Sequence, residues 1–272
     1  MARLSVKQRL ALGETVVGSF HDFIDPNLIE YVGHCGYDFV ILEHEHGVRD
    51  LSTLQDLIRA ADTVGMEAWV RVDRQDYALM ERLLDAGAGG LMVAHVNTAD
   101  DAREVVAHCK YPPDGRRGEG MNRRRGLWTM DGKNDEFRRR VNDEVMILVI
   151  LEEVQAIDNV DAILDVPGVT GVCPGTGDLS LSQGLGSVAS VHPTVQEQVD
   201  RVYAAARRRP GMGMLTFLFD NPDRAPAAVA AGMNLLVVGH DAVIIPAFYK
   251  NLLTRTAKHL EAVGAKRLAS KD

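Results

Sequence analysis

Four ionisable residues follow a short apolar run near the start of the chain. The run 39–42 leads directly into Glu43, His44, Glu45 and His46. Such a group at the end of a buried strand costs stability unless its members are paired, hydrated or bound to something. Titratable clusters mark functional sites only statistically, so a solvated strand end is the alternative. The pattern nevertheless favours a site for chemistry.

Polar residues also lie at the ends of four other apolar runs of the sequence. These residues are Arg71 and Asp73, His95 and Asn97, Glu152 and Glu153, and His240 and Asp241. Asp178 follows the run 169–173 in a glycine-containing turn that opens a helix. Glu152 and Asp178 offer two hard oxygen ligands, which suit a divalent cation such as Mg²⁺, Mn²⁺ or Co²⁺ completed by waters and substrate. A closed structural zinc site is not indicated, because the sequence has no cysteine pair or His-x-x-x-His helix beside them.

Eight short apolar runs must position these residues. They cover 16–20, 39–42, 68–72, 90–96, 145–152, 169–173, 212–219 and 235–238. Nearly continuous hydrophobicity is typical of strands buried on both faces of a parallel sheet, and helical periodicity at 50–63 and 77–87 predicts crossover helices. Eight such units in about 250 residues predict an α/β fold, a TIM (β/α)8 barrel whose active site lies where the strands end. A doubly wound sheet is the alternative, but the first turn lacks its Gly-x-Gly-x-x-Gly pattern.

The segment 111–143 interrupts this rhythm. It contains Pro112, Pro113 and several arginines, and we expect a long loop there, which is either a charged excursion, a subunit contact or a lid. No repeat, low-complexity tract or linker divides the sequence, so we expect a single domain over residues 1–272.

Composition limits the partners. The 272 residues carry a formal net charge of -8, which argues against nucleic acid and anionic membranes as partners and leaves small solutes. Cys35, Cys109 and Cys173 are widely spaced, and we expect three buried thiols rather than disulfides. No apolar stretch is long enough to cross a bilayer, and the sequence starts without an apolar signal core, so we expect a cytoplasmic protein.

Several motifs, in their order and spacing, resemble those of the metal-dependent (class II) pyruvate aldolases of the HpcH/HpaI family. That family includes 4-hydroxy-2-oxoheptanedioate and 2-keto-3-deoxy sugar acid aldolases. The resemblance covers nearly the whole chain. It rests on the strand end 43–46, Arg71, Asp85 in a leucine-rich helix, the Tyr-Pro-Pro-x-Gly-x-Arg-Gly segment 111–118, Glu152, and Asp178 in a Gly-x-x-Asp-Leu-Ser turn.

The resemblance implies a carbon-carbon lyase, an aldehyde-lyase that reversibly cleaves a 4-hydroxy-2-oxoacid to pyruvate and an aldehyde. In such enzymes a divalent metal, here on Glu152 and Asp178, polarises the keto oxygen of pyruvate or another 2-oxoacid. The enolate formed by loss of a methyl proton then attacks the aldehyde in the reverse reaction. The family pattern implies that Arg71 binds substrate and stabilises the developing oxyanion.

The same resemblance assigns the remaining roles. His46 would act as the base, directly or through water, and Asp85 and Glu43 are candidates to orient its imidazole. The backbone N–H groups of Gly177 and Asp178 would hold a carboxylate of the substrate.

Four positions depart from the family pattern. Glu43 replaces an aspartate, Ile150 replaces a glutamine, and Thr176-Gly177 replaces Pro-Ala. Ile150 removes a hydrogen-bonding group, so we expect an acceptor other than a simple dicarboxylate semialdehyde. Additional histidines, which we expect at the rim of the mouth, point to an acceptor pocket with its own polarity: His21, His44, His95 and His240.

Other functions remain open. A Claisen-type synthase or an oxaloacetate decarboxylase could use the same metal and arginine, and a non-catalytic barrel could serve as a binding or assembly protein. The resemblance also implies a homo-oligomer, hexameric or dimer-based. The segment 241–260 is apolar on more than one side, so we expect this C-terminal helix to pack on a neighbouring subunit.

Overall fold

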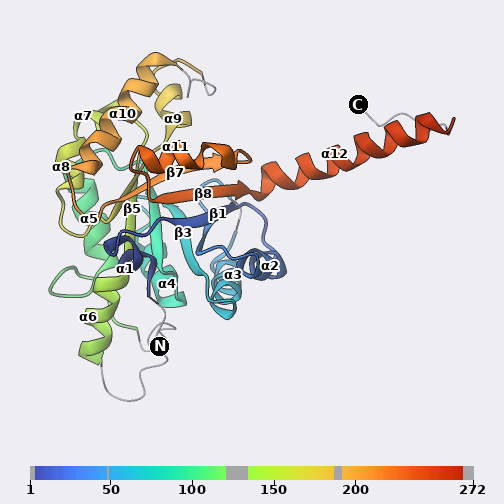
Figure 1. The fold of residues 1–272 in the computed structure, drawn as a ribbon. Helices are drawn as coiled ribbons and strands as arrows, with labels where there is room; N and C mark the ends of the chain where they lie inside the picture. Colours follow the sequence, from blue (N-terminus) through green and yellow to red (C-terminus); the bar gives the residue numbers. More distant parts are fainter. Residues whose placement is uncertain (1–3, 48, 121–133, 187–191, 266–272) are drawn as a thin grey trace.

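Eight parallel strands close into a barrel in chain order (Figure 1). This structure is a computed structural model, and it describes residues 4–47, 49–120, 134–186 and 192–265. The strands are β1 Val16–His21, β2 Phe39–Glu43, β3 Glu67–Asp73, β4 Gly90–Ala94, β5 Met146–Leu151, β6 Gly171–Pro174, β7 Gly213–Phe219 and β8 Leu235–His240. Every predicted apolar run overlaps one of them, so the predicted TIM barrel is confirmed.

Helices connect the strands and surround the barrel, except for the last one, which projects away from it. They are α1 Val6–Ala11, α2 Pro26–His34, α3 Leu51–Thr63, α4 Tyr77–Ala86, α5 Ala99–Cys109, α6 Asn134–Glu144, α7 Val154–Asp158, α8 Val160–Leu164, α9 Thr176–Leu181, α10 Pro193–Arg207, α11 Ala225–Ala230 and α12 Asp241–Ala262. The side chains of Asp50 and Asp76 cap α3 and α4, and Gly87 ends α4 in the left-handed conformation. These caps confirm the two helices predicted from periodicity.

The core has two layers. Strand side chains that point outward pack against the helices, and those that point inward fill the barrel. The rings of Phe39 and Trp69 stack inside the barrel, with centroids 4.4 Å apart. The interior is therefore solid, and chemistry must take place at the mouth, where the carboxyl ends of the strands lie.

Two sequence expectations need correction. The segment 111–143 is not a loop throughout, because α6 occupies its second part and buries Phe137 and Val141 against Tyr111. The arginine-rich part, 121–133, lies outside the described residues. Cys35 is exposed just after α2, whereas Cys109 and Cys173 are buried as expected.

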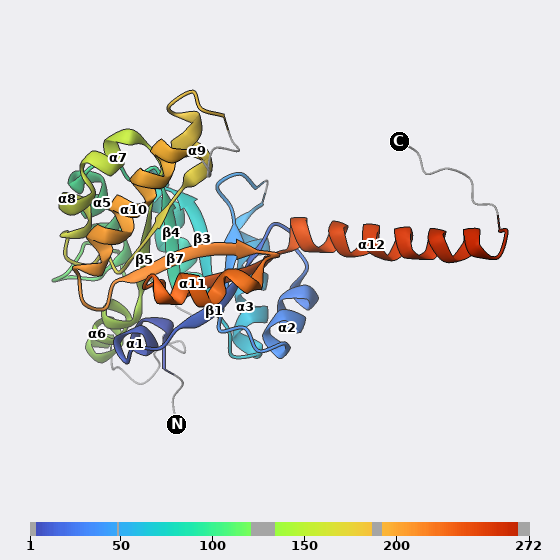
Figure 2. The ribbon, with the colours of Figure 1, turned by 45° about the horizontal axis from the view of Figure 1, so that its top comes forward.

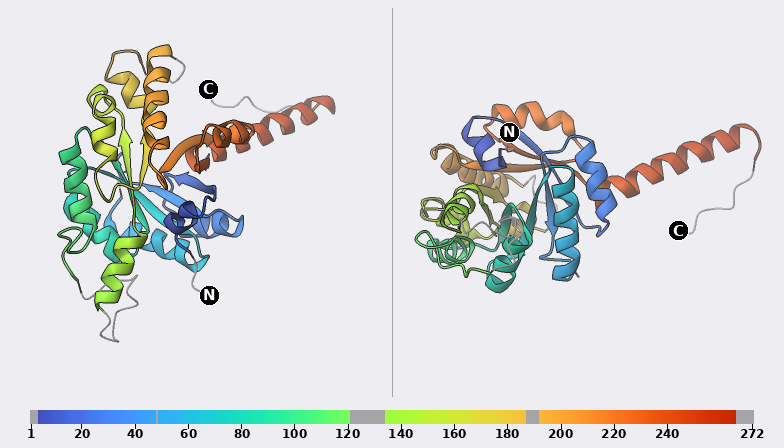
Figure 3. Two further views of the ribbon diagram at one scale, coloured as in Figure 1. Left: turned by 60° about the vertical axis from the view of Figure 1, so that its left-hand side comes forward. Right: turned by 90° about the horizontal axis from the view of Figure 1, so that it is seen from below.

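The last helix stands apart from the rest of the molecule. In all three ribbon views α12 leaves the end of β8 and projects away from the barrel (Figures 1, 2 and 3). Its exposed apolar side chains include Ile244, Phe248, Tyr249, Leu252 and Leu253. Among the residues that the structure describes, no helix is both long and apolar enough to cross a membrane.

Candidate active site

The ends of β2 and β3 place Glu43 and Arg71 side by side in register. The Glu43 carboxylate is almost fully buried; its Oε1 accepts a hydrogen bond from the His46 backbone N–H at 2.7 Å, and its Oε2 accepts one from Arg71 Nε. The guanidinium of Arg71 also lies over the ring of Phe20, 5.2 Å from its centroid. Arg71 is thus held rigidly at the mouth, and both Glu43 oxygens are already engaged.

His46 lies beside this pair but is not oriented by it. Its side chain is 64% exposed, and its Nε2 lies 3.9 Å from Oε2 of Glu45. Glu43 holds the backbone of His46 rather than its imidazole. The expected role of Glu43 in orienting the ring is therefore not visible in its contacts, whereas the neighbouring carboxylate of Glu45 approaches the ring.

Three side chains from different strand ends converge next to Arg71. Glu45, His95 and Glu152, which we call the Glu45 cluster, have potential ligand atoms within 4.8 Å of one another. His95 Nε2 lies 3.3 Å from Glu45 Oε1, and its Nδ1 lies 3.4 Å from Glu152 Oε1. Arg71 Nε lies 3.2 Å from Glu45 Oε2. One arginine, one histidine and two carboxylates therefore form the base of the mouth.

Burial and mutual repulsion control the charge of this cluster. Burial raises the pKa of Glu152 to about 7; the interactions with His95 lower it, and the negative charges of Glu45 and Asp178 raise it further. Burial lowers the pKa of His95, but the carboxylates of Glu152, Glu45 and Glu153 outweigh that effect and raise it. Burial, with a smaller contribution from the neighbouring carboxylates, therefore disfavours the charged form of Glu152 in the protein without a cation.

A divalent cation fits this arrangement. Oε2 of Glu45 is buried and accepts no hydrogen bond within the described part of the chain. Gly175 lies against Glu152, and a Cβ at position 175 would come within 2.5 Å of the Glu152 Cβ and 2.6 Å of its Oε2. Carboxylate oxygens with one imidazole suit Mg²⁺, Mn²⁺ or Co²⁺. A cation would favour the charged form of the buried carboxylates and could bind a Glu45 oxygen that accepts no hydrogen bond.

Asp178 reaches the same region from the next strand. It lies in the first turn of α9, which begins just after β6, and its charge acts on Glu152. Gly177 precedes it in the same turn, with nothing within 4 Å of the position a Cβ would take. Asp178 is not part of the group of ligand atoms within 4.8 Å of one another, and the pair Glu152 and Asp178 as metal ligands stays a prediction.

Asp85 does not join these residues within one chain. It lies near the C-terminal end of α4, nine residues after the cap Asp76, which corresponds to about 13 Å along the helix and away from the mouth. There its carboxylate accepts a hydrogen bond from Arg117 at 2.5 Å. The expectation that Asp85 orients His46 is therefore not met within a single barrel, because the helix carries it toward the other end.

Sequence reasoning did not assign ligand roles to Glu45 and His95. The sequence places both at strand ends, Glu45 in the first cluster and His95 as a rim histidine. The available signal was their position directly after β2 and β4, which predicts a place at the mouth. The distance between them could not be derived, because it depends on the barrel closing and on the loop conformation at His95.

A second polar cluster closes the barrel between β1 and β8. We call His21, Asp22, His240 and Asp241 the Asp241 cluster. The buried Asp241 carboxylate accepts hydrogen bonds from the backbone N–H groups of Asp22 and Phe23, both at 2.8 Å, and its Oδ2 lies 3.2 Å from His21 Nδ1. His240 Nε2 bonds to Asp22. Of the expected rim histidines, two belong here and His95 belongs to the Glu45 cluster.

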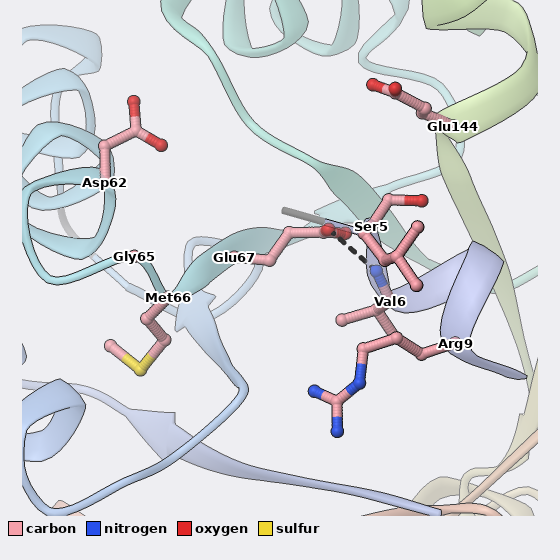
Figure 4. Close-up of a pocket in the computed structure, with 9 residues that line it drawn as sticks. Ser5, Val6, Arg9, Asp62, Gly65, Met66, Glu67 and Glu144 are labelled. Atoms are coloured by element: carbon pink, nitrogen blue, oxygen red, sulfur yellow. Dashed lines mark hydrogen bonds between the residues drawn. The ribbon is translucent and has the colours of Figure 1, made fainter. Parts of the chain in front are cut away.

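A separate pocket of about 300 Å³ opens at the opposite end of the barrel. Figure 4 shows it between α1, the start of β3 and the end of α6, where Glu67 accepts a hydrogen bond from the Val6 N–H at 3.1 Å. Active sites of TIM barrels lie at the carboxyl ends of the strands, whereas this pocket lies at their amino ends. We therefore assign it to the closure of the barrel base by α1.

Comparison with known proteins agrees with this geometry. Residues 17–245 match the family described as HpcH/HpaI aldolase/citrate lyase. The chain is 34% identical over 242 residues to 2-keto-3-deoxy-L-rhamnonate aldolase from Escherichia coli, covering 88% of this chain and 87% of that protein.

Solved structures give the same result. An HpcH/HpaI aldolase from Desulfitobacterium hafniense aligns with a TM-score of 0.82 at 31% identity, over 99% of this chain and all of that one. Citrate synthase SbnG aligns with a TM-score of 0.82 at 27% identity, over 96% of this chain and 100% of that one. Macrophomate synthase aligns with a TM-score of 0.85 at 26% identity, over 95% of this chain and 91% of that one. The chain belongs to the HpcH/HpaI aldolase/citrate lyase family.

Proposed function

We propose that this protein is a class II aldehyde-lyase, which uses a divalent metal to cleave a 4-hydroxy-2-oxoacid reversibly to pyruvate and an aldehyde. The observation that carries the proposal is the Glu45 cluster at the barrel mouth, where two carboxylates and an imidazole have ligand atoms within 4.8 Å of one another beside Arg71. Membership of an aldolase and lyase family supports the same reaction class.

Glu152 and Asp178 are the proposed metal carboxylates, and Mg²⁺, Mn²⁺ or Co²⁺ is the proposed ion. A bound divalent cation supplies Lewis-acid polarisation of the keto oxygen of the substrate. Glu152 suits this role because burial raises its pKa, and a neighbouring cation would stabilise its charged form. The N–H groups of Gly177 and Asp178 are proposed to bind the substrate carboxylate.

Arg71 is proposed to stabilise the negative charge that develops on the keto oxygen. Its guanidinium is fixed by Glu43 and by the ring of Phe20, so little reorganisation is needed when the charge appears. Replacement by lysine keeps a charge but removes the planar fork, and we expect a large loss of cleavage. Exchange of the methyl protons of pyruvate, a simpler reaction, should fall with it, and wild-type exchange in Arg71→Lys would remove Arg71 from the mechanism.

His46 is proposed to remove the proton from the C4 hydroxyl at its Nε2 when the C3–C4 bond breaks to give the aldehyde and the enolate of pyruvate. The same proton then passes, directly or through water, to C3 of the enolate to give pyruvate, and the reverse reaction follows the same path back. Its exposure at the mouth leaves the imidazole accessible to substrate. His46→Ala should lower cleavage by about 10²–10⁴-fold while metal binding is retained. Cleavage at the wild-type rate would exclude His46 as the base.

The proposed substrate is a 2-keto-3-deoxy sugar acid, following the name of the relative at 34% identity. Ile150 is buried in the barrel interior below the mouth, next to Gly175. Because the Ile150 side chain offers no hydrogen-bonding group in place of the glutamine of the family pattern, a dicarboxylate semialdehyde is not expected to be the preferred acceptor. In the synthesis direction, kcat/KM with pyruvate should favour a hydroxyaldehyde over succinic semialdehyde; the opposite preference, unchanged in Ile150→Gln, would show that this position does not select the acceptor.

The decisive experiment measures pyruvate release from a panel of 4-hydroxy-2-oxoacids, with and without a chelator. Pyruvate should appear with at least one sugar acid, stop when EDTA is added and resume with Mg²⁺, Mn²⁺ or Co²⁺. Release that is unaffected by the chelator would contradict the metal-dependent mechanism. Absence of release from the whole panel would contradict the aldolase assignment and favour a binding or assembly protein.

A Claisen-type synthase is the second candidate, favoured by the similarity to citrate synthase SbnG and macrophomate synthase over nearly the whole chain. It needs the same cation and arginine but a different electrophile. Adding oxaloacetate alone, and with an acyl thioester, to the same panel separates the two. Carbon-carbon bond formation or decarboxylation faster than any aldol cleavage would favour this alternative.

We further propose that the protein acts in the cytoplasm as a homo-oligomer, dimer-based or hexameric, in which α12 packs on a neighbouring subunit. The exposed apolar side chains Ile244, Phe248 and Leu252 on a projecting helix support this assembly. Sedimentation at micromolar concentration should give an oligomer. A monomer would contradict the proposal.

A further inference from the structure

We propose that the imidazole of His95 binds the catalytic cation directly through Nδ1, so that the site has mixed nitrogen and oxygen ligands and prefers Co²⁺ to Mg²⁺. Glu45 is the positioning residue that orients this imidazole. The inference rests on the proposed metal-dependent function, because it concerns the same cation.

The two ring nitrogens of His95 face different carboxylates. Nδ1 lies 3.4 Å from Glu152 Oε1 and 3.3 Å from Glu153 Oε1. Nε2 lies 3.3 Å from Glu45 Oε1. A proton on Nε2 would be shared with Glu45, which leaves the lone pair of Nδ1 directed to the side where Glu152 lies. Histidine ligands of metals commonly have a carboxylate on the second nitrogen in this way.

The backbone at His95 holds the ring in this place. Its φ is 58°, in the left-handed region that favours glycine. Its backbone N–H donates to Glu152 Oε1 at 2.8 Å, so the same residue supports the proposed metal carboxylate and presents its own nitrogen beside it. Strained backbone in a non-glycine residue persists where the surroundings determine it, and such positions concentrate at functional sites.

Glu45 is buried beside the His95 ring. Its side chain is 6% exposed, yet Oε2 accepts no hydrogen bond among the described residues, although Arg71 Nε lies 3.2 Å away. Oε1 is the oxygen that faces His95. The carboxylate is therefore buried, directed into the cluster and suited to fix the histidine tautomer.

A nitrogen ligand changes which ion the site prefers. Carboxylates alone suit Mg²⁺, whereas imidazole raises the affinity for Co²⁺ and other later transition metals. The alternative is an ion pair in which a protonated His95 only balances Glu45 and Glu152 and never contacts the metal. In that case the identity of the ion would depend on the carboxylates alone.

Pulsed EPR of the intact protein loaded with Mn²⁺ separates these possibilities without using turnover. Direct ligation predicts a ¹⁴N coupling typical of bound imidazole in the wild type. His95→Gly removes the ring and suits the positive φ, so it should fold and lose the coupling. His259→Ala, an exposed histidine on α12, should retain it. A wild type that binds Mn²⁺ without the coupling, or a His95→Gly variant that keeps it, would overturn the inference.

Titration calorimetry with Co²⁺ and Mg²⁺ gives the second readout. In His95→Gly the affinity for Co²⁺ should fall by at least about 10-fold and that for Mg²⁺ much less. Glu45→Gln should weaken Co²⁺ binding several-fold while the nitrogen coupling remains, and unchanged Co²⁺ affinity would remove Glu45 as a positioning residue. If the wild type binds metal and cleaves substrate, but the affinities for Co²⁺ and Mg²⁺ are unchanged in His95→Gly, only this inference fails. If the wild type binds no divalent ion, the proposed function fails as well.

Discussion

The barrel mouth holds two clusters of histidines and carboxylates, and their charges are compensated in opposite ways. In the Asp241 cluster, the protein supplies the donors: backbone N–H groups of Asp22, Phe23 and Ala242 all bond to Asp241. Burial raises the pKa of Asp241, but these bonds and His21 outweigh it and hold the pKa below its usual range. In the Glu45 cluster, burial instead raises the pKa of Glu152 to about 7.

The contrast separates a structural cluster from a candidate metal site of similar composition. Both groups have carboxylate and imidazole atoms close enough to hold an ion. A cation adds little stabilisation to a carboxylate that already accepts hydrogen bonds from several N–H groups, whereas it strongly stabilises a buried one that faces other carboxylates. Residue type and proximity alone are therefore insufficient to tell the two clusters apart, and the supply of hydrogen-bond donors is the difference between them.

The largest effect is expected for Glu152→Gln. Loss of a buried carboxylate from the cluster should weaken cation binding by more than about 100-fold, because changing even an outer-shell group of a metal site costs about 10–100-fold. Cleavage should fall at least as far. Metal content and calorimetry measure the first effect, and pyruvate release measures the second.

Glu104→Gln is the matched control, since Glu104 lies on α5, is 43% exposed, pairs with Arg116 and is outside the cluster of ligand atoms. It should bind metal within about tenfold of wild type by the same standard. Normal metal occupancy in Glu152→Gln would show that the distinction between the two clusters is wrong.

The two clusters should respond to pH in opposite directions in the metal-free protein. Glu152 has a folded pKa of about 7 against 4.5 in the unfolded chain, so its contribution to stability is present below pH 4.5 and is lost as the pH rises through 7. The loss is on the order of 3 kcal/mol at most. Asp241 has a lowered pKa, so its contribution is present above 3.8 and is lost as the pH falls.

Urea unfolding of the metal-free wild type, Glu152→Gln and Asp241→Asn across this pH range measures both trends. The stability advantage of the wild type over Glu152→Gln should shrink with rising pH, and that over Asp241→Asn should shrink with falling pH. If both stability differences changed with pH in the same direction, the pKa values of Glu152 and Asp241 would be shifted in the same direction, contrary to this comparison.

Asp241→Asn should destabilise the fold by about 2 kcal/mol while leaving cation affinity unchanged. The amide nitrogen that replaces one oxygen cannot accept from a backbone N–H, and hydrogen bonds to a charged group contribute about 1.5–3 kcal/mol each. Asp100→Asn, on an exposed surface pair, should cost less than about 1 kcal/mol. Weaker Mn²⁺ or Co²⁺ binding in Asp241→Asn would mean that the second cluster also holds an ion.

The smallest effect is expected for Gly175→Ala. The new Cβ would lie 2.5 Å from the Glu152 Cβ, so the carboxylate must move and cation affinity should fall by roughly tenfold, within the range of outer-shell changes. Gly177→Ala, where nothing lies within 4 Å, should leave cation affinity unchanged. Equal affinities in both variants would show that Gly175 does not determine the position of Glu152.

The sequence determined the architecture and the residues at the mouth. Continuous apolar runs predicted all eight strands, and the polar residues that follow them, such as Glu43, Arg71 and Glu152, had to lie at one end of a parallel barrel. This inference needs only the period and direction of each element. It also predicted the helices capped by Asp50 and Asp76.

Tertiary structure alone decided which of these residues meet and how their charges are compensated. Glu45, His95 and Glu152 lie on strands β2, β4 and β5 or directly after them, so their separation depends on barrel closure and on the left-handed backbone at His95. Asp85 lies along α4, whose length carries it away from the mouth toward Arg117. Long-range contacts and local solvation set these outcomes, and neither can be read from residue type and spacing along the chain.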